Sequence, residues 1–122
     1  MLSEELQISA RMLGEALRAS PSVQNYLQVQ AKCAADAEAA ELENRLLTLY
    51  QELLERQQRG EALQRSEIDA FNALKYKVQQ HPLIRERDDA LFLVRQTYLD
   101  VADALNLPLG MEFAALALAG KV

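Results

Sequence analysis

The sequence contains few of the residues that carry catalytic, metal or cofactor chemistry. It has one histidine, His81, and one cysteine, Cys33, among 122 residues, and it has no glycine-rich phosphate loop. Metal sites in helical bundles use Glu-x-x-His motifs, whereas no acidic residue lies three positions before His81. Cys33 has no second cysteine or histidine at a metal-ligand spacing. The sequence therefore predicts no catalytic residue, no metal and no cofactor, and it indicates a protein that is not an enzyme.

Two further absences bear on where the chain resides. A single cysteine excludes an intramolecular disulfide, and the first residues show neither the basic segment nor the apolar run of a secretion signal. The most apolar stretch, 107–120, is interrupted by Pro108, Gly110 and Glu112 and is too short to span a bilayer. We therefore expect a cytoplasmic protein without a membrane segment.

Positive charge is also scarce. A net charge of −5 and a pI near 4.9 argue against general binding to DNA, RNA or anionic membranes, because each of these needs a basic face. The densest basic cluster, here called the basic turn, is Arg56, Arg59 and Arg65 around Gly60. Cations are favoured at the end of a helix, which is sufficient to explain this cluster. RNA binding at the basic turn is the alternative.

Helical periodicity is what the sequence does contain. Between Pro21 and Gly60 there is no proline or glycine, and apolar residues recur at steps of three or four. This apolar row consists of Val23, Leu27, Ala31, Ala35, Ala39, Leu42, Leu46, Leu49 and Leu53. Ser20 and Pro21 suit the start of a helix, and Gly60 suits its end. The pattern predicts one helix over 20–60, roughly 55–60 Å long.

The same periodicity predicts three further helices and an apolar tail, over 1–19, 66–81, 82–106 and 107–122. Pro82 is expected to end the third helix at His81, because a residue before proline disfavours helical dihedral angles. These elements predict an all-α protein, an antiparallel bundle of four main helices with one very long central helix and a short apolar C-terminal segment. The chain is expected to form a single helical domain, 1–122.

The long helix also predicts self-association. It exceeds the dimensions of a compact chain of this size, whose radius of gyration is about 14 Å. In its middle part alanine replaces large apolar residues, and small side chains allow two helices to approach closely. The alternative is that alanine serves helix propensity alone. We expect a homodimer whose interface includes Ala31, Ala35, Ala39, Leu42 and Leu46.

The tail carries large apolar side chains that the four helices do not need. A solvated segment of this composition would aggregate, so we expect it to dock. One interpretation is a permanently docked fifth segment. Our hypothesis is instead contact with a partner, released at a joint formed by Pro108 and Gly110. The residues of this predicted partner contact are Leu109, Met111, Phe113 and Leu116.

A series of helical motifs extends over almost the whole chain. In order, they are 10–17 leading into Ser20-Pro21, Tyr26-Leu27, 34–39, Leu49-Tyr50, Gln57-Gln58-Arg59-Gly60, and His81-Pro82-Leu83-Ile84. In these motifs and their spacing, the chain resembles the YlbF/YmcA family of small helical bacterial proteins. The resemblance implies an all-α, antiparallel and self-associating fold, and a regulatory rather than an enzymatic role.

The resemblance also suggests partners. Family members form a complex that acts with ribonuclease Y in mRNA processing, and in bacilli they are tied to competence, sporulation and biofilm control. This implies a non-enzymatic adaptor that binds a ribonuclease Y-type complex or family paralogues, with RNA binding at the basic turn as the alternative function. Some members carry iron–sulfur clusters bound by cysteines. Cys33 alone cannot supply a full cluster from one protomer, which leaves only a cluster shared by several chains.

Overall fold

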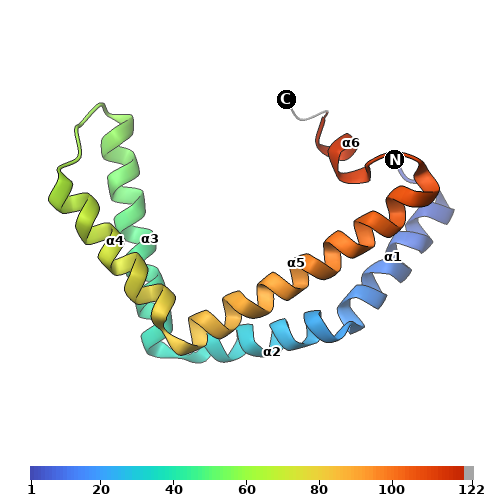
Figure 1. Ribbon diagram of the computed structural model, residues 1–122, viewed down its shortest axis with the longest axis horizontal. Helices are drawn as coiled ribbons and strands as arrows, with labels where there is room; N and C mark the ends of the chain where they lie inside the picture. The colour runs from blue at the N-terminus through green and yellow to red at the C-terminus, as the bar shows by residue number, and fades with distance from the viewer. Residues whose placement is uncertain (120–122) are drawn as a thin grey trace. The chain divides into compact units, whose positions relative to one another are not determined.

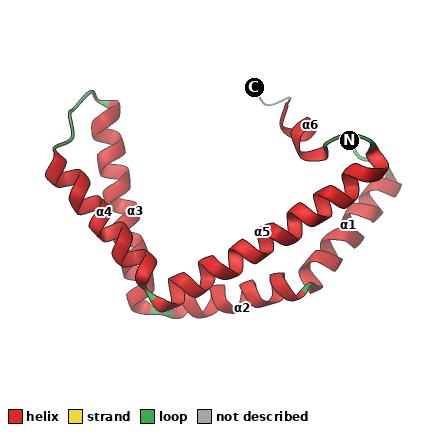
Figure 2. Ribbon diagram, viewed as in Figure 1, coloured by secondary structure: helices red, strands yellow, loops and turns green. Residues whose placement is uncertain are grey.

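The protein is helical throughout the residues that the structure describes. The computed structural model describes residues 1–119, except for the side chains of residues 116, 118 and 119. Figure 2 shows helices joined by short loops, without a strand in this part of the chain. The helices are α1 (Glu4–Ala19), α2 (Pro21–Ala35), α3 (Ala37–Gln58), α4 (Arg65–Gln80), α5 (Pro82–Leu109) and α6 (Phe113–Ala119). The all-α class predicted from the sequence is confirmed.

The single long helix predicted over 20–60 is wrong, because the chain leaves the helical conformation at Asp36. Asp36 has φ −84° and ψ 116°, and its Oδ2 accepts a hydrogen bond of 2.9 Å from the N–H of Ala39. Aspartate is among the best residues for this capping position. The cap therefore outweighs the helix propensity of the surrounding alanines and starts α3. The four-helix bundle built around one central helix is consequently not confirmed.

Contacts divide the chain into two compact units, which are described separately below. Unit 1 comprises Met1–Tyr26 and Asp89–Val122, and unit 2 comprises Leu27–Asp88. Two helices, α2 and α5, contribute residues to both units. Each unit thus joins segments that are distant in the sequence.

Unit 2 is built on a helical hairpin. Figure 1 shows α3 and α4 running antiparallel and side by side. Gly60, with φ +80°, takes the left-handed conformation just after α3, which glycine adopts without steric cost. The core of unit 2 consists of the buried side chains of Cys33, Ala39, Leu42, Val78 and Ile84, with Leu46, Leu74 and Leu83 packed against them. This core draws on α2, α3, α4 and the start of α5.

The two helix junctions of unit 2 contact each other. His81 follows α4, and Pro82 is the first residue of α5. The Nδ1 of His81 accepts a 3.3 Å hydrogen bond from the N–H of Leu83, while its Nε2 lies 3.5 Å from Oδ2 of Asp36. One imidazole therefore links the start of α5 to the residue that caps α3.

Unit 1 pairs α1 with the second half of α5, as Figure 1 shows. Ser22 Oγ and Thr97 Oγ1 form a hydrogen bond of 2.6 Å between α2 and α5. The buried residues of this unit, within its described part, are Val23, Ala90 and Val94. None of them belongs to α1, in which no residue is buried.

The tail differs from expectation in where α5 ends. The helix continues through Pro108 to Leu109, and Gly110 with φ +70° then turns the chain into α6. Pro108 has no N–H to donate to the carbonyl of Ala104, four residues earlier, and the helix ends one residue after the proline. Asn106 does not close α5. Its side-chain oxygen instead accepts a 2.6 Å hydrogen bond from the N–H of Phe113, which positions the start of α6.

Candidate functional site

One side of the α3–α4 hairpin exposes a row of large apolar side chains. Leu47, Tyr50 and Leu54 follow one another at steps of three and four on α3, so they share one side of the helix. Their exposed fractions are 55%, 51% and 38%. On α4, Ile68 is also exposed, and the ring of Phe71 lies 6.2 Å from that of Tyr50, centroid to centroid. We call these five residues the hairpin face.

The hairpin face is hollowed into two adjoining apolar grooves that share Tyr50 and Phe71. One groove also includes Leu46, Leu47 and Val78, and the other includes Leu53, Leu54, Leu63 and Ile68. Glu43 and Lys75 are the only charged residues that line them within the described chain. Two adjoining apolar grooves along a helical hairpin fit the apolar side of another helix.

Arg87 joins three helices of unit 2 through its guanidinium group. Its Nη1 donates a 2.7 Å hydrogen bond to Oε1 of Glu43 on α3 and lies 3.8 Å from the Sγ of Cys33 on α2. Its Nη2 lies 3.1 Å from the carboxylate of Asp88. The hydrogen bond to Glu43 raises the pKa of Arg87, so the group stays charged at any physiological pH. Arg87 therefore acts as a structural cation.

Cys33 is enclosed in the core of unit 2. Only 2% of the residue is exposed, and burial raises the pKa of its thiol, although the nearby charge of Arg87 acts in the opposite direction. A protonated thiol is a poor nucleophile and a poor metal ligand. Among the described residues, no three His, Cys, Asp or Glu side chains gather in a way that could hold a metal ion. The surroundings of Cys33 thus favour a role in packing the core over a role as a nucleophile or a metal ligand.

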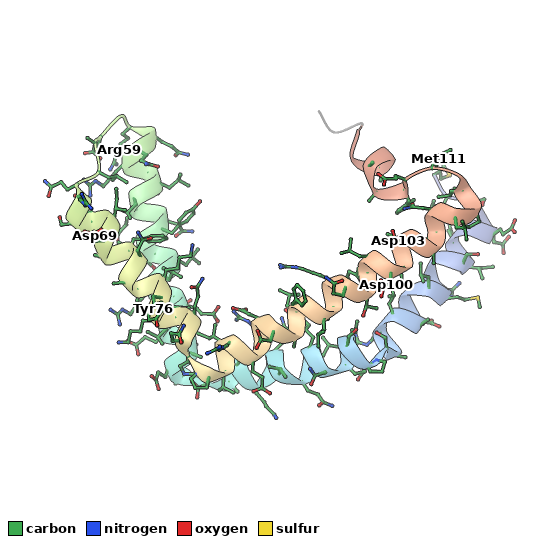
Figure 3. All side chains as sticks on the ribbon, viewed as in Figure 1. Arg59, Asp69, Tyr76, Asp100, Asp103 and Met111 are labelled. Atoms are coloured by element: carbon green, nitrogen blue, oxygen red, sulfur yellow. The ribbon has the colours of Figure 1, made fainter. Side chains whose placement is uncertain are left out.

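The basic turn is largely neutralised by acidic neighbours. Arg56 pairs with both carboxylate oxygens of Glu67, and its Nε lies 3.6 Å from Glu61. The hydrogen bond to Glu67 raises the pKa of Arg56. Arg59, which Figure 3 shows at the end of α3, lies 3.3 Å from the same Glu61. Two of the three arginines proposed for RNA contact therefore already face carboxylates.

The five residues predicted for a dimer interface lie in different surroundings. Ala39 and Leu42 are buried in the core of unit 2, and Leu46 packs against that core. Ala31 and Ala35 are exposed on α2. Ala39 and Leu42 are thus covered by other residues of the same chain. The five predicted interface residues do not lie together on one exposed surface.

The predicted partner-contact residues of the tail are exposed where the structure describes them. Leu109, Met111 and Phe113 have exposed fractions of 47%, 52% and 48%, and Figure 3 shows Met111 between α5 and α6. The side chain of Leu116 lies outside the described residues. Phe113 also lines an apolar groove of unit 1, which we call the α1–α5 groove. Its other lining residues are Leu13, Leu17, Tyr98, Val101, Ala102 and Leu105.

Sequence reasoning missed the hairpin face. The apolar row assigned to the interior included Leu46, Leu49 and Leu53. A second row, Leu47, Tyr50 and Leu54, follows one residue later with the same spacing. Two such rows on one helix make an apolar stripe that is wider than a single neighbouring helix covers. The width of this stripe was the sequence signal from which an exposed apolar surface could have been predicted.

Together, the fold and these grooves place the chain among small all-helical proteins with open apolar surfaces. The chain belongs to the YlbF/YmcA family, because the family model described as "Control of competence regulator ComK, YlbF/YmcA" matches residues 7–107. The resemblance inferred from the sequence is confirmed. The description of the family concerns control of a regulator, so the family is a regulatory one.

A solved structure has a similar fold. It is that of a Bacillus stearothermophilus protein of unknown function (DUF964), with a TM-score of 0.65 and 24% sequence identity. The match covers 88% of this chain and 94% of the other. Nothing among curated proteins matches the sequence significantly. The likeness therefore supports the helical fold, and the family match supports the regulatory class.

Proposed function

We propose that this protein is a non-enzymatic regulator that acts as an adaptor by binding another protein. By its family, the proposed role is to modulate ribonuclease Y-dependent mRNA processing and developmental control in the bacterial cytoplasm. The observation that carries the proposal is the hairpin face, where Leu47 and Tyr50 are each about half exposed beside two adjoining apolar grooves. Surfaces of this kind are typical of protein-binding sites.

The composition of the hairpin face favours one partner over an indiscriminate apolar contact. Tyr50 and Phe71 stand at the centre of the two grooves, and aromatic residues at the centre of an interface commonly contribute most of its binding energy. Glu43 and Lys75 border one groove with opposite charges. Charges at the border of an interface select and orient the partner more than they add affinity. We infer that a helix of a ribonuclease Y-type complex or of a family paralogue occupies the groove.

Two further contacts belong to the proposal. The chain forms a homodimer, which supplies two hairpin faces per assembly. The tail adds a contact through Leu109, Met111 and Phe113, which are exposed around the turn at Gly110. The alternative function, RNA binding at the basic turn, has less support because Arg56 and Arg59 are paired with Glu67 and Glu61.

The experiment compares two substitutions on neighbouring residues of α3. Leu47→Glu places a charge in the groove of the hairpin face, whereas Thr48→Glu places the same charge in a different, more polar cleft of α3. Binding to the purified soluble part of a ribonuclease Y-type protein, and to a family paralogue, is measured by calorimetry. We expect Leu47→Glu to weaken binding at least tenfold and Thr48→Glu to leave it within twofold. The proposal is wrong if neither protein binds the wild type, or if both variants bind as the wild type does.

A further inference from the structure

The grooves of the hairpin face have two charged lining residues, and only one of them is paired within the described chain. Glu43 on α3 and Lys75 on α4 line the same groove, whereas the adjoining groove has no charged lining residue. Glu43 accepts a 2.7 Å hydrogen bond from Nη1 of Arg87. Lys75 forms no ion pair within residues 1–119. The chain therefore supplies a counterion for Glu43 and none for Lys75.

Arg87 keeps Glu43 from selecting a basic partner. Its guanidinium group is held between two carboxylates, because Nη1 contacts Glu43 and Nη2 lies 3.1 Å from Asp88. The side chain of Arg87 is only 22% exposed, which shields this pairing from solvent. A carboxylate that already has such a partner gains little from a second cation. The charge that remains available to a bound molecule is the ammonium group of Lys75.

A helix that covers the groove removes water from around Lys75. In the free chain this residue is exposed, so its charge is hydrated and stable. An ammonium group that loses its water without gaining an anion raises the free energy of the complex, whereas a carboxylate beside it compensates the loss. Partners that lack an acidic side chain at this point are therefore disfavoured. A penalty against the wrong partner is a common source of specificity in an otherwise apolar contact.

We propose that the hairpin face binds an amphipathic helix that carries an Asp or Glu side chain beside its apolar stripe, placed against Lys75. This inference rests on the proposed function and names the chemistry of the partner. The apolar stripe fills the two grooves, and the carboxylate pairs with the cation that the chain leaves without a counterion. Lys75 is thus the residue that determines which helices the face accepts.

The two grooves also set the dimensions of this helix. Their lining residues on α3 begin at Glu43 and end at Gln57, which are about 21 Å apart along the helix at 1.5 Å per residue. A partner helix of about four turns covers this distance. Lys75 lines the groove that contains Glu43 and Val78, at one end of the face. The acidic side chain of the partner therefore lies toward one end of its apolar stripe.

Three synthetic helices test this chemistry directly. Peptides of about 18 residues (five helical turns) share one leucine stripe and differ at one position beside it, near an end, which is Glu, Gln or Lys. Their binding to the full chain is measured by fluorescence anisotropy. We expect the Glu peptide to bind at least fivefold more tightly than the Gln peptide and at least tenfold more tightly than the Lys peptide. The preference should shrink between about 0.1 M and about 1 M salt, because the screening length falls from about 10 Å to about 3 Å.

Charge variants assign the preference to one residue. Lys75→Glu should reverse the order, so that the Lys peptide binds most tightly. Lys77→Glu is the matched control, because Lys77 is exposed on the same helix but lines a different cleft, and it should keep the order of the wild type. Glu43→Gln should also keep that order, since Arg87 already pairs with Glu43. If circular dichroism shows that Lys75→Glu is unfolded, Lys75→Met replaces it and should abolish the difference between the Glu and Lys peptides.

Three results would overturn the inference: absent or equal binding of the three peptides, an order that the Lys75 variant leaves unchanged, or peptide binding that survives Leu47→Glu. Equal binding would show that Lys75 extends its amine into water above the bound helix, so that the occupant needs no carboxylate. The adaptor proposal is judged separately, by binding of the ribonuclease Y-type protein and the paralogue. If neither protein binds while the peptides keep their Lys75-dependent order, the proposed partners are wrong and the chemistry of the face stands.

Discussion

At the scale of single residues, burial decides what Cys33 can do. The thiol lies in the core of unit 2 beside Arg87, whose guanidinium group is held at 2.7 Å from Glu43. An iron–sulfur cluster shared by several chains would need a thiolate that reaches the surface. Cys33 could meet this need only by leaving the core, where it packs among Ala39, Leu42 and Ile84.

We expect the thiol of native Cys33 to react slowly with iodoacetamide. Because burial raises its pKa, the folded chain holds the proton more tightly than the unfolded chain does. The thiol therefore stays protonated as the pH approaches 9.0, its ordinary pKa, and the contribution of this proton to folding stability falls as the pH rises further. Mass spectrometry at pH 7 and pH 8.5 should show labelling at least tenfold slower in the native chain than in the urea-unfolded chain. Equal rates would show that Cys33 is accessible.

At the scale of elements, the sequence indicated where helices form better than where they stop. The apolar row continues from Leu27 to Leu53 without a change of spacing, and a single non-helical residue, Asp36, interrupts the helix inside it. Periodicity cannot detect such a break, because the spacing of the row is the same on both sides of it. The structure shows the change only in the burial: Ala31 and Ala35 of the row are exposed on α2, where Cys33 is buried instead, whereas Ala39 and Leu42 of the row are buried on α3. Ser20 illustrates the same difficulty, since its hydroxyl donates a 2.6 Å hydrogen bond to the carbonyl of Leu17 and so closes α1. A residue suited to capping can serve either neighbouring helix.

The cap at Asp36 should be measurable as stability. Asp36→Ala removes the acceptor for the N–H of Ala39 and the partner of His81, so the free energy of unfolding should fall by about 1 kcal/mol. Asp36→Asn keeps an oxygen that can accept the same hydrogen bond, so its loss should be clearly smaller. Urea unfolding followed by circular dichroism gives both values. If Asp36→Ala unfolds with the same free energy as the wild type, the helix propensity of the alanine-rich segment contributes as much stability as the cap.

At the scale of the whole molecule, the sequence predicted the family and the helical class but not the use of each apolar surface. Ala39 and Leu42 belong to the predicted apolar row, yet they are covered by their own chain. Leu47, which was not assigned to any surface, is exposed on the hairpin face. Helical spacing shows which side chains share a face, but a face does not reveal whether its neighbour comes from the same chain. That information depends on contacts between segments distant in the sequence.

Removal of the tail tests whether it acts in recognition or in the fold. A chain that ends at Leu109 keeps all of α5 and loses Met111, Phe113 and α6. Phe113 is 48% exposed although it lines the α1–α5 groove, so its loss should cost the fold little.

We therefore expect the shortened chain to keep its remaining helices and its dimer mass by circular dichroism and sedimentation, and to bind the ribonuclease Y-type partner at least tenfold more weakly. Phe113→Ala in the full chain should show part of the same loss of binding. Unfolding or dissociation of the shortened chain would instead make the tail a permanently docked segment. In that case, the partner contact would belong to the hairpin face alone.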